Sequence, residues 1–150
     1  MGTSTDGILA YGYNLGAEDA LNVREVNDDG ELNASWNVGS DDLVEAATRA
    51  LYASIPGLPD VEYGWECEAP VKEHLGVWFE SYCHVDYPMW ILTTSVIRVY
   101  RGDVEEIDGA YLDTQPGDNG WNEKLAHALA VLGLTPTQEH PAWLLASDWG

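Results

Sequence analysis

The sequence predicts an α+β fold, with one mainly antiparallel sheet and two principal helices packed on one face. Three observations support this prediction. The run from Pro88 to Tyr100 is apolar, aromatic or β-branched at most positions, as expected of a central strand. Residues 40–54 and 121–132 carry apolar side chains at helical spacing. No linker or repeat divides the 150 residues, so we expect 1–150 to form a single domain.

The first 60 residues are predicted to contain a strand, a weak edge strand and a helix. Residues 6–13 form the first strand, and residues 31–38 form the edge strand after a turn at 27–30. Ser40 is expected to cap the helix, which ends at the Pro-Gly-Leu-Pro segment 56–59. The core face of this helix is predicted to hold Leu43, Ala47, Ala50, Leu51 and Ser54. The wet face is predicted to hold Asp41, Asp42, Glu45, Thr48 and Arg49.

Four strands are predicted in the middle of the chain. Residues 61–69 alternate acidic and other positions, which favours a strand with one wet face. Residues 75–85 form the next strand, with Val77, Phe79 and Ser81 on one side and Trp78, Glu80 and Tyr82 on the other. The long strand then turns at 101–103 into a short acidic strand, 104–107.

The last 36 residues are predicted to hold a loop, a helix and a docked tail. The loop at 115–120 leads into a helix that ends at Gly133. Its buried stripe is predicted to be Trp121, Leu125, Ala128, Leu129 and Leu132. The apolar residues Trp143, Leu144 and Leu145 are expected to pack on the body of the domain.

The charge balance limits the function. The chain has 26 Asp and Glu against six Lys and Arg, for a formal net charge of −20. Binding to nucleic acid phosphates or to anionic membranes requires clustered cations, so we exclude both as partners. We find no basic leader, no run of 18 apolar residues and no disulfide framework, and therefore expect a cytoplasmic protein.

The sequence contains no motif that assigns catalysis, a cofactor or a metal. Cys67, His74, Cys83 and His84 are zinc-ligand types, but their spacing is wrong for a structural site. Gly7, Gly12 and Gly16 are too widely spaced to form a dinucleotide cradle, so we expect no cofactor. A Cys83/His84 pair near a carboxylate leaves a small hydrolase or nucleotide-processing enzyme as one alternative.

The carboxylates themselves have two explanations. One is solubility, or adaptation to a salt-rich cytoplasm. The other is that carboxylates ordered on strands and helices resemble a phosphate backbone and occupy the basic groove of a nucleic-acid-binding protein. The residues expected to do this are Asp41, Asp42, Glu45, Glu62, Glu66, Glu68, Glu105, Glu106 and Asp108. Trp36, Trp65, Trp78 and Trp90 are candidate aromatic anchors beside them.

The two ends of the chain carry a family resemblance. Thr5, Asp6, Ile8, Leu9, Tyr11, Gly12 and Tyr13 make up the first motif, and Pro141, Trp143, Leu145, Ala146, Ser147 and Trp149 make up the second. Both resemble the ends of a family of small acidic proteins encoded by actinobacterial phages and their hosts, which has no assigned enzyme activity. The resemblance implies a phage protein that acts on host machinery, including inhibition of defence systems that target nucleic acids.

The leading hypothesis is therefore a non-enzymatic acidic phage protein that binds and inhibits a basic, nucleic-acid-binding host protein. A passive structural or assembly protein of a phage is the second alternative, beside the Cys83/His84 enzyme.

Overall fold

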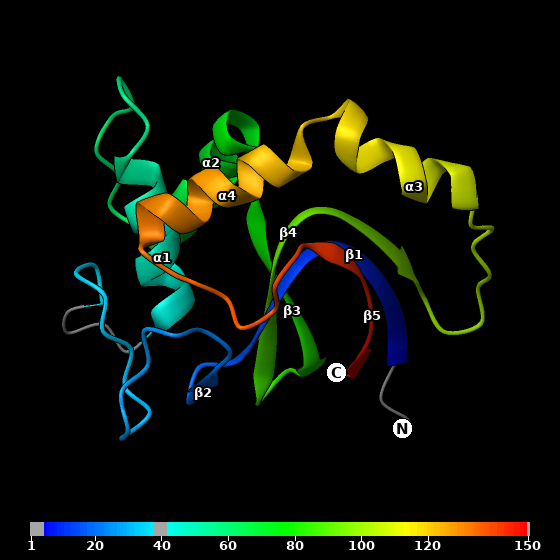
Figure 1. The fold of residues 1–150 in the computed structure, drawn as a ribbon, viewed down its shortest axis with the longest axis horizontal. Coiled ribbons are helices and arrows are strands. Elements are labelled where there is room, and N and C mark those ends of the chain that lie inside the picture. Colours follow the sequence, from blue (N-terminus) through cyan, green and yellow to red (C-terminus); the bar gives the residue numbers. More distant parts are fainter. Residues whose placement is uncertain (1–4, 38–41, 150) are drawn as a thin grey trace.

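The long first strand, β1, forms the middle of a bent five-stranded sheet (Figure 1). The computed structural model describes residues 5–37 and 42–149. The strands are β1 (Thr5–Ala17), β2 (Ala20–Leu21), β3 (Trp78–His84), β4 (Pro88–Val99) and β5 (Ala142–Trp149). The predicted strands at 6–13, 75–85 and 88–100 are thereby confirmed, with β1 extending four residues further than expected.

The sheet closes on itself. Its strand order is β2-β1-β4-β3-β5, and β5 also pairs with β1, so β1, β4, β3 and β5 form a ring. The β3–β5 pairing is short and parallel, and the other pairings are antiparallel, which makes the sheet mixed. β1 and β4 approach so closely at a bulge that a Cβ on Gly12 would lie 1.8 Å from the carbonyl oxygen of Leu92. This position therefore has room only for glycine.

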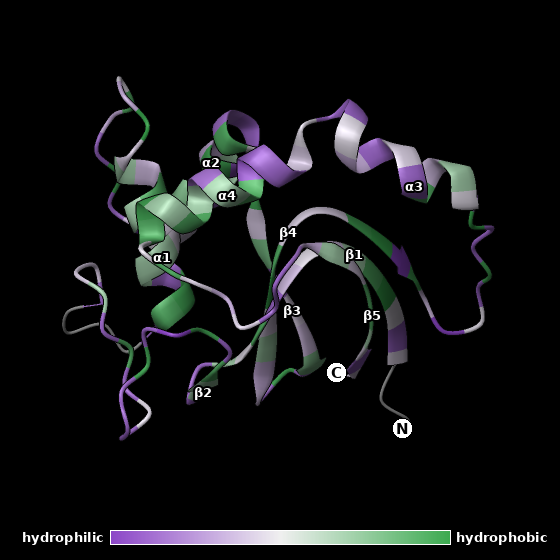
Figure 2. Cartoon of the chain, in the orientation of Figure 1, coloured by the Kyte–Doolittle hydropathy of each residue, from purple (hydrophilic) through white to green (hydrophobic). Residues whose placement is uncertain are grey.

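Within the described residues, four α-helices and one short 3₁₀ helix complete the fold. They are α1 (Leu43–Ala53), η1 (Gly64–Cys67), α2 (Glu68–Leu75), α3 (Gly109–Asp118) and α4 (Trp121–Leu132). The α-helices lie along one side of the sheet, which confirms the predicted α+β class (Figure 1). Apolar residues are concentrated in α1, α4 and the strands (Figure 2). No helix in the described part of the chain has the length and apolar character needed to cross a membrane.

The core has two parts, one on each side of the strands. Under the helices, Tyr11 and Leu92 of the sheet pack with Leu51 of α1 and the α4 stripe. The five α4 residues predicted to be buried are all buried. A smaller cluster of Ile8, Ala10 and Ile91 fills the ring of strands. The predicted faces of β3 agree with this arrangement, because Phe79 packs on the helix side whereas Tyr82 packs with the ring cluster.

One guanidinium group, that of Arg98, links four strands of the sheet. Arg98 of β4 lies 3.0 Å from an Asp6 oxygen of β1, 3.0 Å from a Glu80 oxygen of β3 and 3.1 Å from an Asp148 oxygen of β5. Burial lowers the pKa of Arg98, but the hydrogen bonds to the three carboxylates outweigh it and raise that pKa above its ordinary value. We call these four residues the Arg98 cage.

A second contact between distant segments ties the loop after β2 to the loop after α4. The Thr135 amide donates a 2.8 Å hydrogen bond to Glu25, and the Arg24 amide donates to the Thr135 carbonyl. Burial alone would raise the pKa of Glu25, but the Thr135 hydrogen bonds lower it below its ordinary value.

Residues 61–69 are not a strand, contrary to the prediction. Residues 64–67 form η1, and residues 68 and 69 begin α2. The Glu66 carboxylate accepts a 2.8 Å hydrogen bond from the Tyr63 amide, which caps the beginning of η1. The acidic alternation that suggested a strand also fits one face of a helix, because Glu62 and Glu66 are four residues apart. Gly76 ends α2 in the left-handed conformation.

The prediction of a short acidic strand at 104–107 is also wrong. These residues are exposed, and Val104 reaches 93%. A strand here would have no apolar face, because each side would carry one glutamate and one apolar residue. Instead the Asp108 carboxylate accepts a 3.0 Å hydrogen bond from the Ala110 amide and begins α3.

The loop predicted at 115–120 mostly belongs to α3, which continues through Pro116 to Asp118. Proline lacks the amide that would bond to the Leu112 carbonyl, four residues earlier. The Trp143 indole of β5 donates to that carbonyl at 2.7 Å and replaces the missing hydrogen bond. A partner 31 residues away therefore allows proline inside this helix.

The remaining differences concern single segments. The edge strand at 31–38 reduces to one bridge between Val26 and Leu32, and Val38 lies outside the described residues. Ser40 and Asp41 also lie outside them, and Asp42 is the cap of α1.

Three predictions of side-chain burial are wrong. Thr48 is buried because its hydroxyl bonds to the Val44 carbonyl within α1, and Ser54 is exposed at the helix end. Leu145 is 84% exposed because alternate residues of β5 face outward.

Candidate functional site

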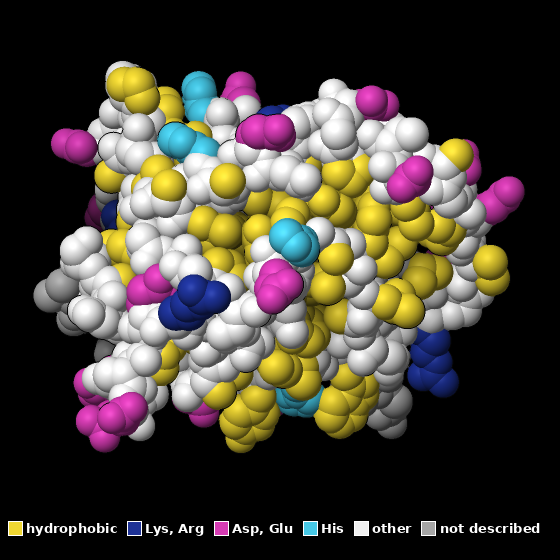
Figure 3. Space-filling model, viewed as in Figure 1, with side chains coloured by type: hydrophobic (Ala, Val, Ile, Leu, Met, Phe, Trp, Pro, Cys, Tyr) yellow, Lys and Arg dark blue, Asp and Glu magenta, His cyan; other side chains and the backbone are white. Residues whose placement is uncertain are grey.

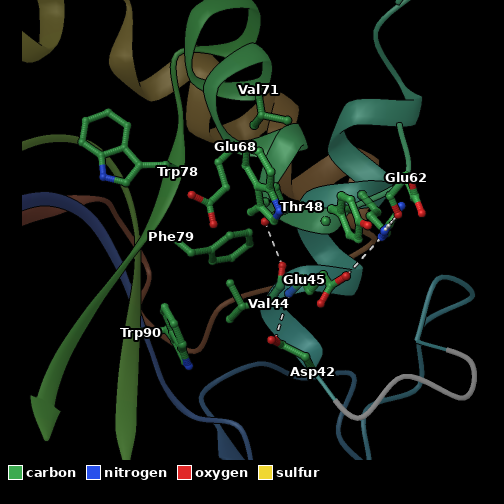
Figure 4. A pocket seen from close by; sticks show the side chains of 14 residues that line it. Asp42, Val44, Glu45, Thr48, Glu62, Glu68, Val71, Trp78, Phe79 and Trp90 are labelled. Atoms are coloured by element: carbon green, nitrogen blue, oxygen red, sulfur yellow. Dashed lines mark hydrogen bonds and ion pairs between the residues drawn. The ribbon is translucent and has the colours of Figure 1, made fainter. Parts of the chain in front are cut away.

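One hollow on the described surface is bordered by acids that the sequence singled out. It is a pocket of about 480 Å³ between α1, residues 62–65, α2 and the facing strands β3 and β4 (Figure 4). Its lining includes Asp42, Glu45, Glu62 and Glu68, four of the nine carboxylates predicted to bind a partner. We call it the α1–α2 pocket.

Aromatic side chains make up much of the rest of the lining. Tyr63 and Trp65 stack in parallel with their ring centroids 6.3 Å apart, and Trp65 is 70% exposed. Trp78, Phe79 and Trp90 line the side formed by the strands (Figure 4). A mostly apolar pocket with a few polar groups is typical of ligand sites.

The sequence identified three of these aromatic residues as anchors: Trp65, Trp78 and Trp90. The fourth, Trp36, packs instead against the core, and its indole donates a 2.7 Å hydrogen bond to the Leu132 carbonyl. Tyr63 and Phe79 were not identified, because a short exposed turn and a strand position carry no local sign of a shared cavity.

The pocket carboxylates differ in the hydrogen bonds and ion pairs that they already make within the protein. Asp42 accepts a 3.0 Å hydrogen bond from the Glu45 amide as the α1 cap. Glu45 pairs with Arg49 at 3.4 Å. Arg49 is the one basic residue among the described lining residues, and it also donates a 3.0 Å hydrogen bond to the backbone carbonyl of Glu62.

Glu68 is available for a ligand. No hydrogen bond or ion pair within the described ranges engages its carboxylate, which extends from α2 into the pocket on the side of Trp78 and Phe79 (Figure 4).

Gly64 shapes the acidic side of this pocket. A Cβ at this residue would lie 2.3 Å from Cγ of Glu45, so the glutamate side chain occupies the space that a larger residue would take. Gly64 does not have a positive φ, so the need for glycine at this residue comes only from the close contact with the Glu45 side chain.

The other predicted acids lie elsewhere. Glu66 caps η1, and Asp41 lies outside the described residues. Glu105, Glu106 and Asp108 line a second hollow, of about 320 Å³, next to α3. α1 and α3 lie at opposite ends of the molecule, so these acids form two groups (Figure 1). On the face drawn in Figure 3 the acidic side chains stand mainly around the outline, and apolar side chains fill much of the centre.

Cys83 and His84, the residues of the enzyme alternative, do not line a common hollow among those described, although Nδ1 of His84 lies 3.8 Å from an Asp86 oxygen. Cys83 is exposed, with a left-handed φ of 81°, and lines a third hollow with residues of β5. No histidine is among its described lining residues. The Nδ1 of His84 accepts a hydrogen bond from the Asp86 amide, and its ring lies 4.7 Å from the Trp149 ring. Cys67 is buried, and burial raises the pKa of its thiol.

Comparison of the chain with models of protein families, with curated proteins and with solved structures finds no match.

Proposed function

We propose that this protein is a non-enzymatic binding protein whose acidic pocket face engages a basic partner, a nucleic-acid-binding protein of the host of a phage. The observation that carries the proposal is the α1–α2 pocket, where four carboxylates surround an aromatic lining. Opposite charge steers such partners together and suppresses binding to other acidic molecules. Occupation of a basic groove would exclude nucleic acid from it, which is the proposed mode of inhibition.

Rigidity supports the choice of this face over the acidic loops. Asp42 and Glu45 lie at the beginning of α1, and Glu68 lies in the first turn of α2. Charges on ordered elements lose little conformational entropy on binding, so more of the electrostatic attraction appears as affinity.

The test is capture of a partner from actinobacterial lysate at low salt, followed by measurement of its affinity against salt concentration. The pocket variant carries Asp42→Asn, Glu45→Gln, Glu62→Gln and Glu68→Gln. The control variant carries Asp28→Asn, Asp29→Asn, Glu123→Gln and Glu139→Gln, none of which lines the pocket. Each variant loses four negative charges, so both fall from −20 to −16.

We expect the pocket variant to bind at least tenfold more weakly than the control variant, because only its substitutions remove charges at the interface. The captured protein should also lose nucleic acid when the wild-type protein is added. Equal weakening by both variants would show that net charge alone drives binding and would contradict the proposal.

A further inference from the structure

We infer that the α1–α2 pocket is a receptor for one arginine side chain presented by the basic partner. This inference rests on the proposed function and specifies the chemistry of its central contact. A pocket of about 480 Å³ falls within the range of small-ligand sites and has room for one long side chain with its neighbouring backbone.

The charge of the lining excludes two other classes of ligand. Four carboxylates and one arginine give the described lining a formal charge of −3, which repels phosphates and other anions. An apolar ligand would remove water from the Glu68 carboxylate without replacing its hydrogen bonds, at a large cost in free energy. A cation is attracted by the negative lining and can replace the water that the Glu68 carboxylate loses.

The aromatic residues favour a flat cation with an aliphatic stem. Guanidinium groups stack on indole rings and also pair with a carboxylate through two parallel hydrogen bonds. Trp65 offers an exposed indole and Glu68 a carboxylate without a partner among the described residues. An ammonium group has no planar face to stack, so lysine fits this combination less well.

The protein already shows both kinds of contact around the pocket. Nζ of Lys72 lies 4.2 Å from the centre of the Trp78 ring, a cation–π contact. Arg49 is held by the Glu45 carboxylate and the Glu62 carbonyl. With Glu45 paired to Arg49 and Asp42 capping α1, Glu68 is the pocket carboxylate that extends toward Trp78 and is placed to pair with an incoming arginine (Figure 4).

The test uses a peptide with blocked ends whose only charge is on its central residue, acetyl-Gly-Ser-Gly-Arg-Gly-Ser-Gly-amide, and its citrulline and lysine counterparts. Citrulline has nearly the same shape as arginine without the charge. Binding is followed by ¹H–¹⁵N NMR of the seven tryptophan indoles, assigned by single Trp→Phe substitutions. We expect the arginine peptide to shift the Trp65 and Trp78 signals and to leave those of Trp121 and Trp149 in place.

We expect citrulline, and separately Glu68→Gln, to weaken binding of the peptide about tenfold, since each removes one charge from the pair. Trp65→Ala should weaken it several-fold without harming the fold, because that ring is mostly exposed. Glu123→Gln, on the exposed side of α4, is the matched control and should have no effect.

Three outcomes would overturn the inference: equal binding of the citrulline peptide, equal or tighter binding of the lysine peptide, or no shift of Trp65 and Trp78 at millimolar peptide. A partner that still binds in a pocket-dependent and salt-dependent way would leave the proposed function standing in those cases. If the partner also binds the pocket and control variants equally, both proposals fail.

Discussion

The Arg98 cage gives the clearest prediction for stability. Replacing Arg98 by methionine keeps most of the side-chain volume but removes the guanidinium group that the carboxylates of Asp6, Glu80 and Asp148 share. Removing one partner of a fully buried ion pair costs about 3–5 kcal/mol, because the remaining charge stays desolvated. The cage side chains are 16–27% exposed, and water and salt therefore screen part of this effect. We expect Arg98→Met to lower the free energy of unfolding by about 2–4 kcal/mol.

The assay is urea unfolding at pH 7, followed by tryptophan fluorescence. The matched control is Arg101→Met, which makes the same substitution and the same change in net charge at an exposed turn. We expect the control to change stability by no more than about 0.5 kcal/mol.

A double variant separates repulsion from lost packing. Adding Glu80→Gln to Arg98→Met removes one of the three facing charges and keeps the acceptor for the Trp78 indole, which donates to Glu80 at 2.9 Å. We expect this second substitution to recover about 1 kcal/mol, whereas in the wild-type protein the same change should be destabilising. Two results would contradict a stabilising role of the Arg98 cage: a cost of Arg98→Met no larger than that of Arg101→Met, or a Glu80→Gln substitution that is equally harmful in both backgrounds.

Three further predictions use the same unfolding assay. Gly12→Ala should lower the free energy of unfolding by about 3 kcal/mol, because the added Cβ meets the backbone of β4. Gly117→Ala has open space in α3 and should raise the free energy of unfolding by up to about 1 kcal/mol. Equal effects of the two substitutions would contradict this prediction. Glu25 has a lowered pKa in the folded state, so its contribution is complete above its ordinary pKa of 4.5 and is lost as the pH falls through the folded value. The stability difference between wild type and Glu25→Gln should therefore shrink on acidification, and a constant difference would count against it. The Trp90 indole nitrogen is buried without a partner in the described structure, so Trp90→Phe should cost about 1 kcal/mol less than Trp36→Phe, which breaks a hydrogen bond to a backbone carbonyl.

Elements with a complete local pattern could be predicted from the sequence. The stripe of α4 from Trp121 to Leu132 repeats at helical spacing and ends at Gly133, whose left-handed φ of 65° suits glycine. β4 is a long run of strand-forming residues, and its centre is buried. Backbone geometry fixes these periods, so they appear in any segment that folds against a core.

The α1–α2 pocket could be predicted only in part. Composition pointed to acids and tryptophans, and three tryptophans and four of the acids do line one pocket. The sequence could not separate them from the acids at the far end of the molecule, because it does not say which segments meet. Whether Glu66 binds a partner or caps a helix likewise depends on one hydrogen bond to Tyr63.

The residue pattern alone predicts the fold class, the positions of α1, α4, β1, β3 and β4, and the acidic character of the surface. The packing of distant segments determines that β5 closes the ring, that Trp143 permits Pro116 within α3, and that Arg98 binds three carboxylates. The physical reason is distance along the chain: Asp6 and Arg98 are 92 residues apart, and Arg98 and Asp148 are 50 apart. Periodicity reports which face of a segment is buried, whereas ion pairs, caps and pockets depend on which segments the core brings together.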